Sequence, residues 1–275
     1  MLANGKLSTW LPITQSIVQG SGIGPMMYIM FASDLKTVSK MNVLCKYADD
    51  TTLIVGELSD VSVETEFNNI KQWATDNKLK LNLSKTKELI FHKPRLDCNT
   101  LPVVIPGVTR VNEIKFLGVV FNSTLCFHQH VDSVSSVVNQ RLYLLNKMKQ
   151  CGLSKEGLQI IFQAIIVSRI TYALSAFSGF LNSCDIDRIN AVFRKAKRWG
   201  LTDSVYNVED IIDITQYKLF KCITYNNNHC LYHLLPGKRL DDYDFRARGH
   251  AYALPECKAS LSKCSFINNS LYKYI

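Results

Sequence analysis

Several common features are missing from this sequence, and each absence argues against a class of protein. The nine cysteines include no Cys-x-x-Cys pair, and 275 residues are too many for a small disulfide-stapled fold. No secretory signal peptide is recognisable at the start of the sequence. We therefore expect reduced thiols and an intracellular protein, nuclear or cytoplasmic, that is not secreted.

The sequence also has no convincing zinc site and no convincing membrane span. A cluster of two Cys and two His residues between 222 and 233 fits no standard zinc spacing. The apolar run 158–181 contains Arg169 near its centre, where a charge would be costly in a bilayer. We expect this run to be a buried helix of a helical bundle, and we expect no membrane partner.

Acidic residues are outnumbered by basic ones, and the excess is concentrated in the second half. Residues 1–126 hold 13 Lys/Arg and 11 Asp/Glu, whereas residues 127–275 hold 19 and 12. A basic half suggests a polyanionic partner, most commonly nucleic acid. The alternative is an ordinary basic protein with solvated charges, and the charge alone does not separate the two.

Hydrophobic residues make up 47% of the chain, enough for one large domain or two modest ones. Hydrophobic periodicity and turn residues predict mostly short strands and two helices up to about residue 126, and mainly helices after it. The expected elements of the first part are a hairpin around Asn4–Gly5, a helix over 26–39, a hairpin over 41–55, a helix over 60–79, a strand over 88–92, and a hairpin joining 103–105 to 114–121. The expected helices of the second part are 131–148, 155–180, 186–199 and 217–234, with no regular structure over 236–275.

The most informative residues are Tyr47, Ala48, Asp49 and Asp50. They place two adjacent carboxylates at the turn of a predicted hairpin. Such carboxylates suit Mg²⁺, which prefers oxygen ligands, and two such ions can clamp both oxygens of a phosphoryl transfer. The alternative is a polar turn, because Asp is common in turns for local hydrogen-bonding reasons.

Other motifs follow in a fixed order around this hairpin. They are Gln19, Gly20, Ser21, Gly24 and Pro25 before it; then Trp73, Asn77, Leu79, Leu81, Asn82, Lys85, Thr86 and Phe91; then Lys115, Phe116, Leu117 and Gly118. The ordered set resembles the reverse transcriptases of LINE-type (non-long-terminal-repeat) retrotransposons, in particular the jockey-like group. The resemblance implies an α+β fold, with a partial palm over residues 1–126, an all-α thumb-like domain over 127–235 and an irregular C-terminal extension over 236–275.

The resemblance also implies roles for individual residues in an RNA-directed DNA polymerase. Asp49 would be a metal ligand, Asp50 a ligand or its support, and Lys85 the general acid for pyrophosphate. The remaining implied sites are nucleotide or template contacts by Gln19, Gly20, Ser21, Gly24 and Tyr47, a primer grip of Phe116, Leu117 and Gly118, and nucleic-acid backbone contacts by Arg194, Lys195, Lys197 and Arg198. The implied cofactor is Mg²⁺, and the implied partners are an RNA template and a DNA primer. The alternatives are an ordinary glycine turn, a half-buried tyrosine, a solvated lysine, a plain hairpin, and a solvated helix face or nuclear-import patch.

The chain departs from the family where an earlier palm strand should supply a further carboxylate. Only 18 residues precede Gln19, so this strand and the fingers region are expected to be absent. We therefore expect a fragment that is inactive alone, binds Mg²⁺ weakly, exposes apolar surface and requires a complementing polymerase fragment. A non-catalytic RNA- or DNA-binding remnant and a decayed copy without a selected role remain as alternatives.

Overall fold

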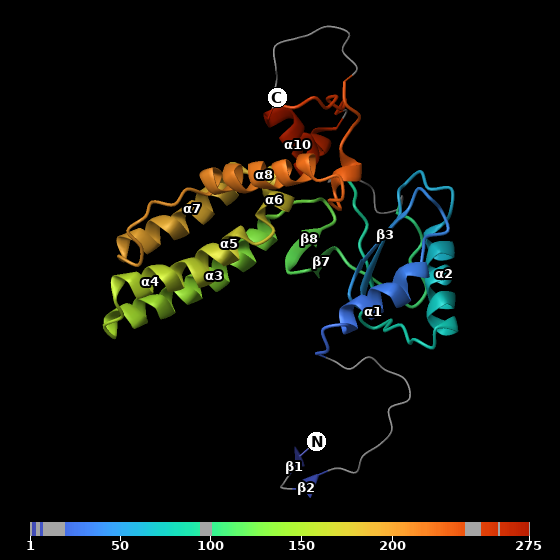
Figure 1. Cartoon of the computed structure of the whole chain (residues 1–275), viewed down its shortest axis with the longest axis horizontal. Coiled ribbons are helices and arrows are strands. Elements are labelled where there is room, and N and C mark those ends of the chain that lie inside the picture. The colour runs from blue at the N-terminus through green and yellow to red at the C-terminus, as the bar shows by residue number, and fades with distance from the viewer. Residues whose placement is uncertain are drawn as a thin grey trace. The chain divides into compact units, whose positions relative to one another are not determined.

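The computed structural model describes residues 2–3, 6–7, 20–93, 101–239, 249–257 and 259–274. The chain divides into two compact units (Figure 1). Unit 1 comprises 1–88 and 102–109, and unit 2 comprises 89–101 and 110–275. Helices and two-stranded sheets make up both, which is compatible with the predicted α+β class. The predicted domain boundaries at residues 126 and 235 stay predictions.

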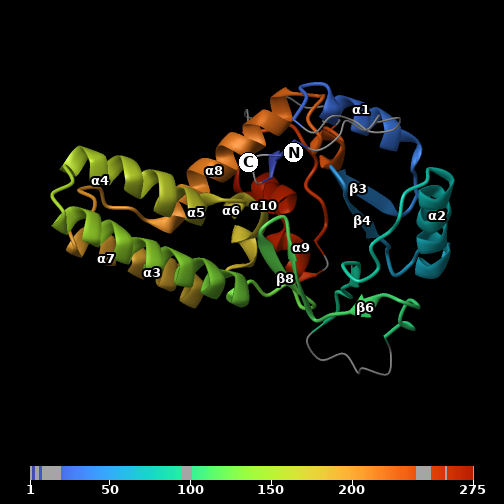
Figure 2. The same ribbon diagram turned by 90° about the horizontal axis from the view of Figure 1, so that it is seen from below.

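Unit 1 contains small sheets and two helices. Its elements are β1 (Leu2–Ala3), β2 (Lys6–Leu7), α1 (Gly24–Phe31), the 3₁₀ turn η1 (Ala32–Asp34), β3 (Val43–Tyr47), β4 (Asp50–Ile54), α2 (Val63–Asp76) and β5 (Lys87–Glu88), and β6 (Thr109–Arg110) begins in it. Strands β1 and β2 pair with Leu2 opposite Leu7, as expected for a hairpin around Asn4–Gly5. Figure 2 shows the β3–β4 hairpin between α1 and α2.

Helix α1 is shorter than the predicted helix over 26–39. Pro25 occupies its first turn, where the missing N–H costs nothing. The helix ends at Phe31 and η1 ends at Asp34, because the backbone N–H groups of Val38 and Ser39 bond to a glutamate of α2 instead of continuing the helix. No residue of α1 is buried, although the helix is strongly apolar.

Helix α2 forms where the apolar periodicity predicts it. The Ser62 hydroxyl accepts a hydrogen bond from the Thr65 N–H and caps the first turn. Phe67 packs against Ile105 and Val108, which come from the loop that returns to unit 1. The prediction of a strand over residues 103–105 was wrong, because these residues belong to this loop. Pro106 and Gly107 make a turn there, with the Val108 N–H bonded to the Ile105 carbonyl and Gly107 at φ +81°.

The predicted strand over 114–121 does not pair with residues 103–105 but folds on itself as a hairpin within residues 113–122. Strand β7 (Glu113–Phe116) pairs with β8 (Val119–Asn122), and Leu117 and Gly118 form the turn. The expected strand over 88–92 is reduced to β5, which ends at Glu88. Beyond it, the His92 N–H bonds to the Ser123 carbonyl, at 2.9 Å, outside any strand ladder.

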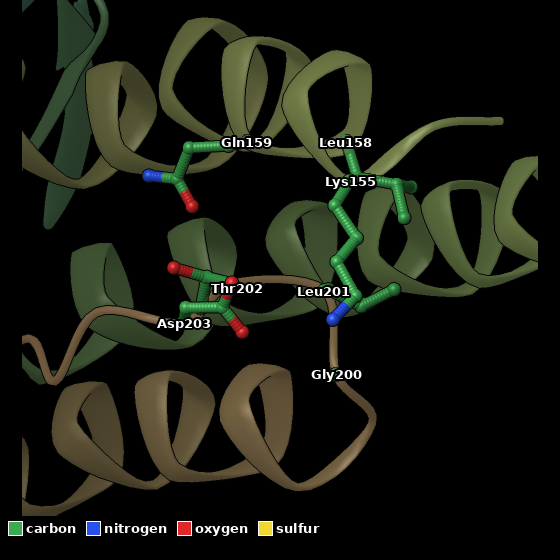
Figure 3. A pocket seen from close by; sticks show the side chains of 7 residues that line it. All are labelled: Lys155, Leu158, Gln159, Gly200, Leu201, Thr202 and Asp203. Atoms are coloured by element: carbon green, nitrogen blue, oxygen red, sulfur yellow. The ribbon is translucent and has the colours of Figure 1, made fainter.

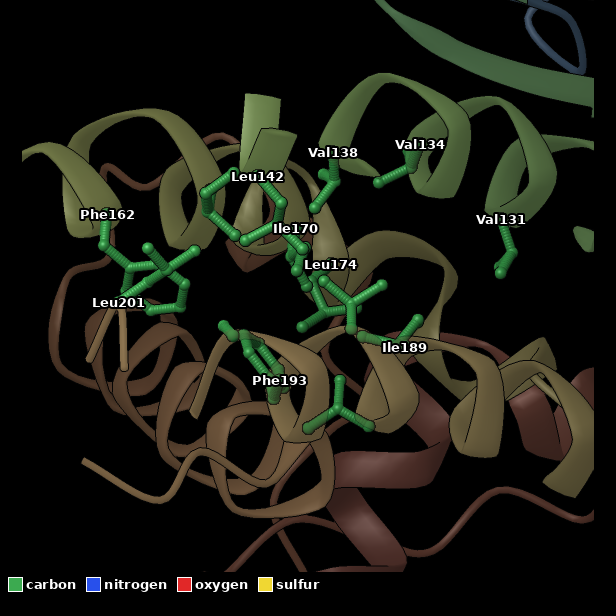
Figure 4. Close-up of a cluster of buried hydrophobic side chains, with 14 of the residues drawn as sticks. Val131, Val134, Val138, Leu142, Phe162, Ile170, Leu174, Ile189, Phe193 and Leu201 are labelled. Atoms are coloured by element: carbon green, nitrogen blue, oxygen red, sulfur yellow. The ribbon is translucent and has the colours of Figure 1, made fainter. Parts of the chain in front are cut away.

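The rest of unit 2 is helical. Its elements are α3 (His128–Gln150), α4 (Lys155–Phe162), the π-helical turn η3 (Gln163–Val167), α5 (Ser168–Thr171), α6 (Leu174–Phe177), the 3₁₀ turn η4 (Ser178–Phe180), α7 (Ser183–Arg198), α8 (Val208–Tyr225), the 3₁₀ turn η5 (Tyr232–Leu234), α9 (Ser260–Cys264) and α10 (Phe266–Lys273). Helices α3, α4, α5, α6 and α7 enclose one continuous apolar core (Figure 4). Gly152, at φ +88°, follows α3 as predicted. Helix α8 starts and ends about nine residues earlier than expected.

The predicted helix over 155–180 is interrupted twice. Side chains stabilise the π turn, because Arg141 of α3 donates to the Ile165 carbonyl at 2.7 Å and the Ser168 hydroxyl donates to the Ala164 carbonyl. The second interruption is at Ala173, which has φ +55° between α5 and α6. Sequence periodicity did not reveal these breaks, since the apolar stripe continues through both of them.

By length and composition, Lys155–Phe180 is apolar enough to cross a membrane, and it is the one such segment found in the described part of the chain. Six of its side chains belong to the buried core, namely Leu158, Phe162, Ile166, Ile170, Leu174 and Phe177. Such a buried stripe is typical of a helix inside a bundle. The expected absence of a membrane partner stays a prediction.

Residues 236–275 were expected to lack regular structure, but α9 and α10 lie within them. Leu271 of α10 and Tyr252 are buried against Phe220 of α8. The end of the described chain therefore packs onto the helical unit through an apolar cluster of its own. Its apolar residues are few and irregularly spaced, so no periodic signal predicted these short helices.

Candidate functional site

The two adjacent carboxylates lie at the tip of the β3–β4 hairpin. Tyr47 pairs with Asp50, which leaves Ala48 and Asp49 as the two residues of the turn. Ala48 has φ +51°, a left-handed conformation that residues with a Cβ rarely adopt. Asp49 and Asp50 are both exposed. A strained tight turn thus presents two carboxylates to solvent.

Lys46 ties this hairpin to the end of α1. Its ammonium donates to the Leu35 carbonyl at 2.6 Å and to the Ala32 carbonyl. Loss of hydration lowers the pKa of Lys46, and the nearby charge of Asp34 opposes that shift. Lys46 therefore donates its hydrogen bonds to carbonyl groups at a helix end, and its ammonium is not available to bind a ligand.

Glu66 of α2 anchors the loop that leads into β3. Its buried carboxylate accepts hydrogen bonds from the N–H groups of Val38 (2.9 Å) and Ser39 (2.8 Å), and from the Asn42 amide (2.9 Å). Burial by itself would raise the pKa of Glu66, but these three donors together lower it below its usual value. A charged, fully bonded carboxylate thus fixes the base of the hairpin.

Asp34 is a further acidic residue near these elements, and its partner is Trp73. The Trp73 indole N–H donates to its Oδ1 at 3.0 Å, and the Trp73 ring packs edge-on against Phe31 at 5.7 Å between centroids. The arrangement joins α2 to the end of α1. Asp34 therefore stabilises the helix packing of unit 1, and it is not among the predicted metal ligands.

The predicted nucleotide contacts before α1 are only partly visible. Gln19 lies outside the described residues. Gly20 has φ +86°, so a glycine is favoured there for its backbone conformation, and a Cβ would meet no atom within 4 Å. The Ser21 hydroxyl is buried without a hydrogen-bond partner in the described structure, and its carbonyl accepts from the N–H of Gly24 at 3.2 Å.

Lys85, the predicted general acid, lies in the turn that follows α2. Its N–H bonds to the Asn82 carbonyl at 3.1 Å, and its side chain is exposed. No hydrogen bond or ion pair joins it to Asp49 or Asp50 among the residues that the structure describes. Its predicted role remains a prediction.

The donor set at the hairpin tip fits magnesium as part of a shared site. Across the described residues, no group of three His, Cys, Asp or Glu side chains is placed to hold a metal ion. Mg²⁺ is commonly bound through one or two carboxylates together with waters and substrate phosphates. Asp49 and Asp50 supply such a pair, so the remaining ligands would come from substrate, water or another strand.

The predicted primer grip is the turn of the β7–β8 hairpin. Leu117 and Gly118 have φ +44° and +86°, which is the pattern of a type I′ turn. The Tyr172 hydroxyl donates to the Leu117 carbonyl at 2.7 Å, and a Cβ on Gly118 would lie 3.1 Å from the Tyr172 ring. Phe116 contacts Phe121 at 6.4 Å between ring centroids. The tip is thus clamped by Tyr172, the residue that follows α5.

A buried histidine supports the outer edge of the same hairpin. The Val120 N–H donates to Nδ1 of His130 at 3.3 Å. Burial lowers the pKa of His130, and the charges of Arg169 and Lys115 lower it further. The neutral imidazole therefore accepts the otherwise unpaired N–H of an edge strand.

The four basic residues near the C-terminal end of α7 do not form one uniform surface. Lys195 donates to Asn139 of α3 at 2.9 Å and lies 4.7 Å above the Trp199 ring. Arg194 donates to a backbone carbonyl seven residues earlier in its helix. Lys197 and Arg198 are exposed, and no side-chain hydrogen bond or ion pair joins them to other described residues. They are therefore the side chains most available to phosphates.

The sequence-predicted residues fall in both units. Asp49, Asp50 and Lys85 belong to unit 1, whereas the primer-grip turn and the basic helix belong to unit 2. A small pocket lies in unit 2 between the start of α4 and the segment after α7, lined by Lys155, Gln159 and Asp203 among others (Figure 3). Its volume of about 10 Å³ admits roughly one water, so it is no ligand site.

Sequence reasoning missed the residues that position the two hairpins. Lys46 directly precedes the motif, and its position next to Tyr47 was an available signal. Glu66 and Tyr172 gave no signal, since each acts through a contact with a segment at least 24 residues distant in the chain. Contacts of that kind depend on the fold and are not encoded in any local pattern.

Comparison with known proteins yields sequence relatives. Residues 1–121 match the family described as reverse transcriptase (RNA-dependent DNA polymerase). The chain is 22% identical over 210 residues to the RNA-directed DNA polymerase from mobile element jockey of Drosophila funebris, covering 71% of this chain and 23% of that protein. It is 23% identical over 211 residues to the jockey polymerase of Drosophila melanogaster, covering 71% of this chain and 23% of that protein. It is also 23% identical over 209 residues to the probable polymerase from transposon BS of Drosophila melanogaster, covering 70% and 23%.

No solved structure matches the chain. The chain spans about a quarter of the length of the curated relatives that it matches. The ordered motifs, the matched residues 1–121 and these relatives agree. The chain is thus related to the reverse transcriptases of the jockey-like, non-long-terminal-repeat retrotransposons.

Proposed function

We propose that this chain is a reverse transcriptase fragment that contributes one half of a two-metal nucleotidyl-transfer site. The observation that carries the proposal is the β3–β4 tip, where Asp49 and Asp50 are exposed on a tight turn. The match of residues 1–121 to the reverse transcriptase family supports it. Unit 1 corresponds in this proposal to part of a palm, and the helices that follow residue 127 correspond to a thumb.

In this proposal, each predicted residue has a defined task. Asp49 is the metal ligand and Asp50 supports it. Bound magnesium would lower the pKa of the primer 3′-hydroxyl and neutralise charge on the departing pyrophosphate. Tyr47, exposed beside the turn, packs against the primer end, and Lys85 donates a proton to pyrophosphate. Phe116, Leu117 and Gly118 hold the primer strand, and Gln19, Gly20, Ser21 and Gly24 contact nucleotide or template.

We expect the chain to be inactive alone, because two carboxylates hold magnesium weakly without further ligands. Primer extension on an RNA template measures this directly. The chain alone should extend no primer, whereas a chain preceded by the upstream part of a jockey-type polymerase should do so. Robust synthesis by the chain alone that disappears in Asp49→Asn would show that the proposed inactivity is wrong.

Metal binding provides a second test that needs no catalysis. Paramagnetic Mn²⁺ should broaden the amide signals of residues 47–50 when template–primer and nucleotide are present. Asp49→Asn should remove this broadening. The matched control is Asp34→Asn, which changes an exposed carboxylate that bonds to Trp73 and should leave the broadening intact. Equal broadening in wild type and Asp49→Asn would exclude the hairpin tip as the metal site.

The basic second half supports a second candidate, a non-catalytic RNA or DNA binder. The exposed Lys197 and Arg198 would contact phosphates without reading sequence. Binding should then fall with rising salt and weaken in the Lys197→Gln/Arg198→Gln double variant. Lys195→Gln is a poor probe, because this side chain also braces α3 against α7. Binding that persists at high salt, or that the double variant retains, would count against a phosphate contact at α7.

A further inference from the structure

Helix α8 carries an exposed face that the proposed function leaves unused. Its residues recur every three or four positions and are all exposed: Ile214, Tyr217, Lys218, Lys221, Cys222 and Tyr225. This spacing places them on one side of the helix. The buried residues of the same stretch are Gln216, Phe220 and Ile223. These buried side chains hold α8 in place, so the exposed residues, called here the α8 outer face, are available to a partner.

Two tyrosine rings and a lysine between them dominate the α8 outer face. The Lys221 ammonium lies 4.6 Å from the centroid of the Tyr217 ring. Tyr274 meets the same ring edge-on, at 5.2 Å between centroids, and so orients it. Tyr225 is 83% exposed and lies eight residues beyond Tyr217, about 12 Å further along the helix axis. The face therefore alternates aromatic rings with a cation.

The charge of this face is positive and has no internal counter-ion. Asp213, the last acidic residue of α8, forms an ion pair with Lys273 of α10. Residues 214–240 then contain four Lys or Arg and no Asp or Glu. Among the residues that the structure describes, no ion pair joins Lys218 or Lys221 to an acidic side chain. Such a surface is complementary to a polyanion.

We propose that the α8 outer face binds single-stranded nucleic acid, with unpaired bases stacked on Tyr217 and Tyr225 and phosphates on the two lysines. Aromatic rings interleaved with cations hold single strands without reading their sequence, because every base has a flat face. A protein partner is a poorer fit, since Ile214 alone is too little for the apolar centre of an interface. The proposal does not depend on the metal site at Asp49 and Asp50.

Fluorescence anisotropy with a labelled single-stranded RNA of mixed sequence tests the face. A strand of about twelve nucleotides is long enough for such a site, and EDTA in the buffer keeps metal binding out of the result. Tyr225→Ala should weaken binding about 5- to 140-fold, the range expected for the stacking of one base. Tyr225→Phe keeps the ring and should retain the wild-type affinity. An unchanged affinity in Tyr225→Ala would overturn the proposal.

Two comparisons separate stacking from other contacts. Ile214→Ala is the matched control, because Ile214 is 54% exposed on the same face and has no aromatic ring, so its truncation should leave the affinity unchanged. An abasic strand carries the phosphates without the bases, and it should bind wild type and Tyr225→Ala equally. If Ile214→Ala weakens RNA binding as much as Tyr225→Ala does, stacking is overturned in favour of a general apolar contact.

The lysines are tested by the salt dependence of binding. Lys221→Gln should reduce the slope of log K against log salt concentration by about 0.7, the value for one phosphate of a single strand. Lys40→Gln removes an exposed lysine of unit 1 and should leave this slope unchanged. A wild-type slope in both Lys218→Gln and Lys221→Gln would overturn the phosphate contacts.

The form of the nucleic acid is the last point to test. Single-stranded DNA of the same sequence should bind as well as RNA, because stacking and phosphate contacts do not read the 2′-hydroxyl. An RNA–DNA duplex should show no response to Tyr225→Ala, since its paired bases offer no free face. An equal response of duplex and single strand would overturn the single-strand assignment.

A spectroscopic measurement reports stacking directly. The ring-proton signals of Tyr225 are identified by their loss in Tyr225→Ala and followed by NMR during titration with the RNA strand. A base stacked on the ring should shift these signals upfield, whereas inorganic phosphate should leave them unchanged. Absence of an upfield shift at saturating RNA would overturn the proposed stacking.

Discussion

The two hairpins of this chain have similar turns and different settings. Both use a two-residue turn whose first residue, Ala48 or Leu117, is a non-glycine at positive φ. The β7–β8 hairpin buries Val119 in the helical core and is clamped by Tyr172. The β3–β4 hairpin buries none of its strand residues; it is held near its tip by Lys46 and at its base by the loop that Glu66 binds.

The two hairpins are fixed in place in two different ways. Packing fixes the β7–β8 tip, so its geometry depends on apolar burial. Hydrogen bonds from a few polar groups fix the β3–β4 hairpin, which leaves its carboxylates and much apolar surface open. Met26, Ile29 and Met30 of α1 are each about two-thirds exposed. Exposed apolar surface of this kind is a liability for solubility.

Truncation of aromatic residues should show the largest difference between the two regions. Phe127 is almost completely buried and contacts Phe121 of β8 at 5.5 Å, so Phe127→Ala should cost about 3–5 kcal/mol of unfolding free energy. Phe31→Ala, at a site 41% exposed, should cost about 1 kcal/mol. Urea unfolding monitored by amide exchange measures both. Similar losses of unfolding free energy would show that the two regions are equally well packed.

Removal of the Glu66 carboxylate should release the β3–β4 hairpin. Glu66→Ala leaves three donors without their acceptor, and we expect a loss of about 3 kcal/mol, measured by amide exchange of β3 and β4. Because the folded pKa is lowered, this stability is present above the usual pKa of a glutamate and is lost as the pH falls through the folded value.

The isosteric variant Glu66→Gln checks the electrostatic part of this argument. Its exchange rates in β3 and β4 should not accelerate with acid in this range, whereas the wild-type rates should. An identical acid response in wild type and Glu66→Gln would mean that Glu66 does not control the hairpin.

Two glycines with the same backbone conformation separate strain from contact. Gly118 and Gly152 have φ +86° and +88°, but only at Gly118 would a Cβ meet a neighbour, the Tyr172 ring at 3.1 Å. Gly152→Ala should cost about 1 kcal/mol from backbone strain alone. Gly118→Ala should cost about 2 kcal/mol, because the contact adds to the strain, and Tyr172→Ala should remove the excess. Equal losses at both glycines in urea unfolding would argue against a tight clamp.

The smallest expected effect is at Ala48. Glycine adopts φ +51° without steric cost, so Ala48→Gly should stabilise the β3–β4 turn by a few tenths of a kcal/mol to about 1 kcal/mol. Slower amide exchange of Thr51 and Thr52 would report it. Ala48→Val should have the opposite effect, because a β-branched residue is strongly disfavoured in this conformation. Faster exchange in Ala48→Gly would contradict a strained turn.

Local signals predicted much of the secondary structure. The Asp49–Asp50 hairpin, helix α2 and helix α3 lie where alternation, periodicity and Gly152 placed them. Predictions were wrong where a distant partner replaced a local bond. Helix α1 stops early because Glu66 takes the N–H groups of Val38 and Ser39. The turn at Pro106–Gly107 packs on α2 and does not close a hairpin.

By itself, the sequence determined the family relationship, the apolar stripes of the helices and the two carboxylates at one turn, because each depends on residue order over short distances. Tertiary structure alone decided which hairpin is embedded, where the helix over 155–180 breaks, and that Tyr172 clamps the β7–β8 hairpin. The physical reason is that burial, charge proximity and hydrogen bonding at these points join segments far apart in the chain, such as Tyr172 and Leu117.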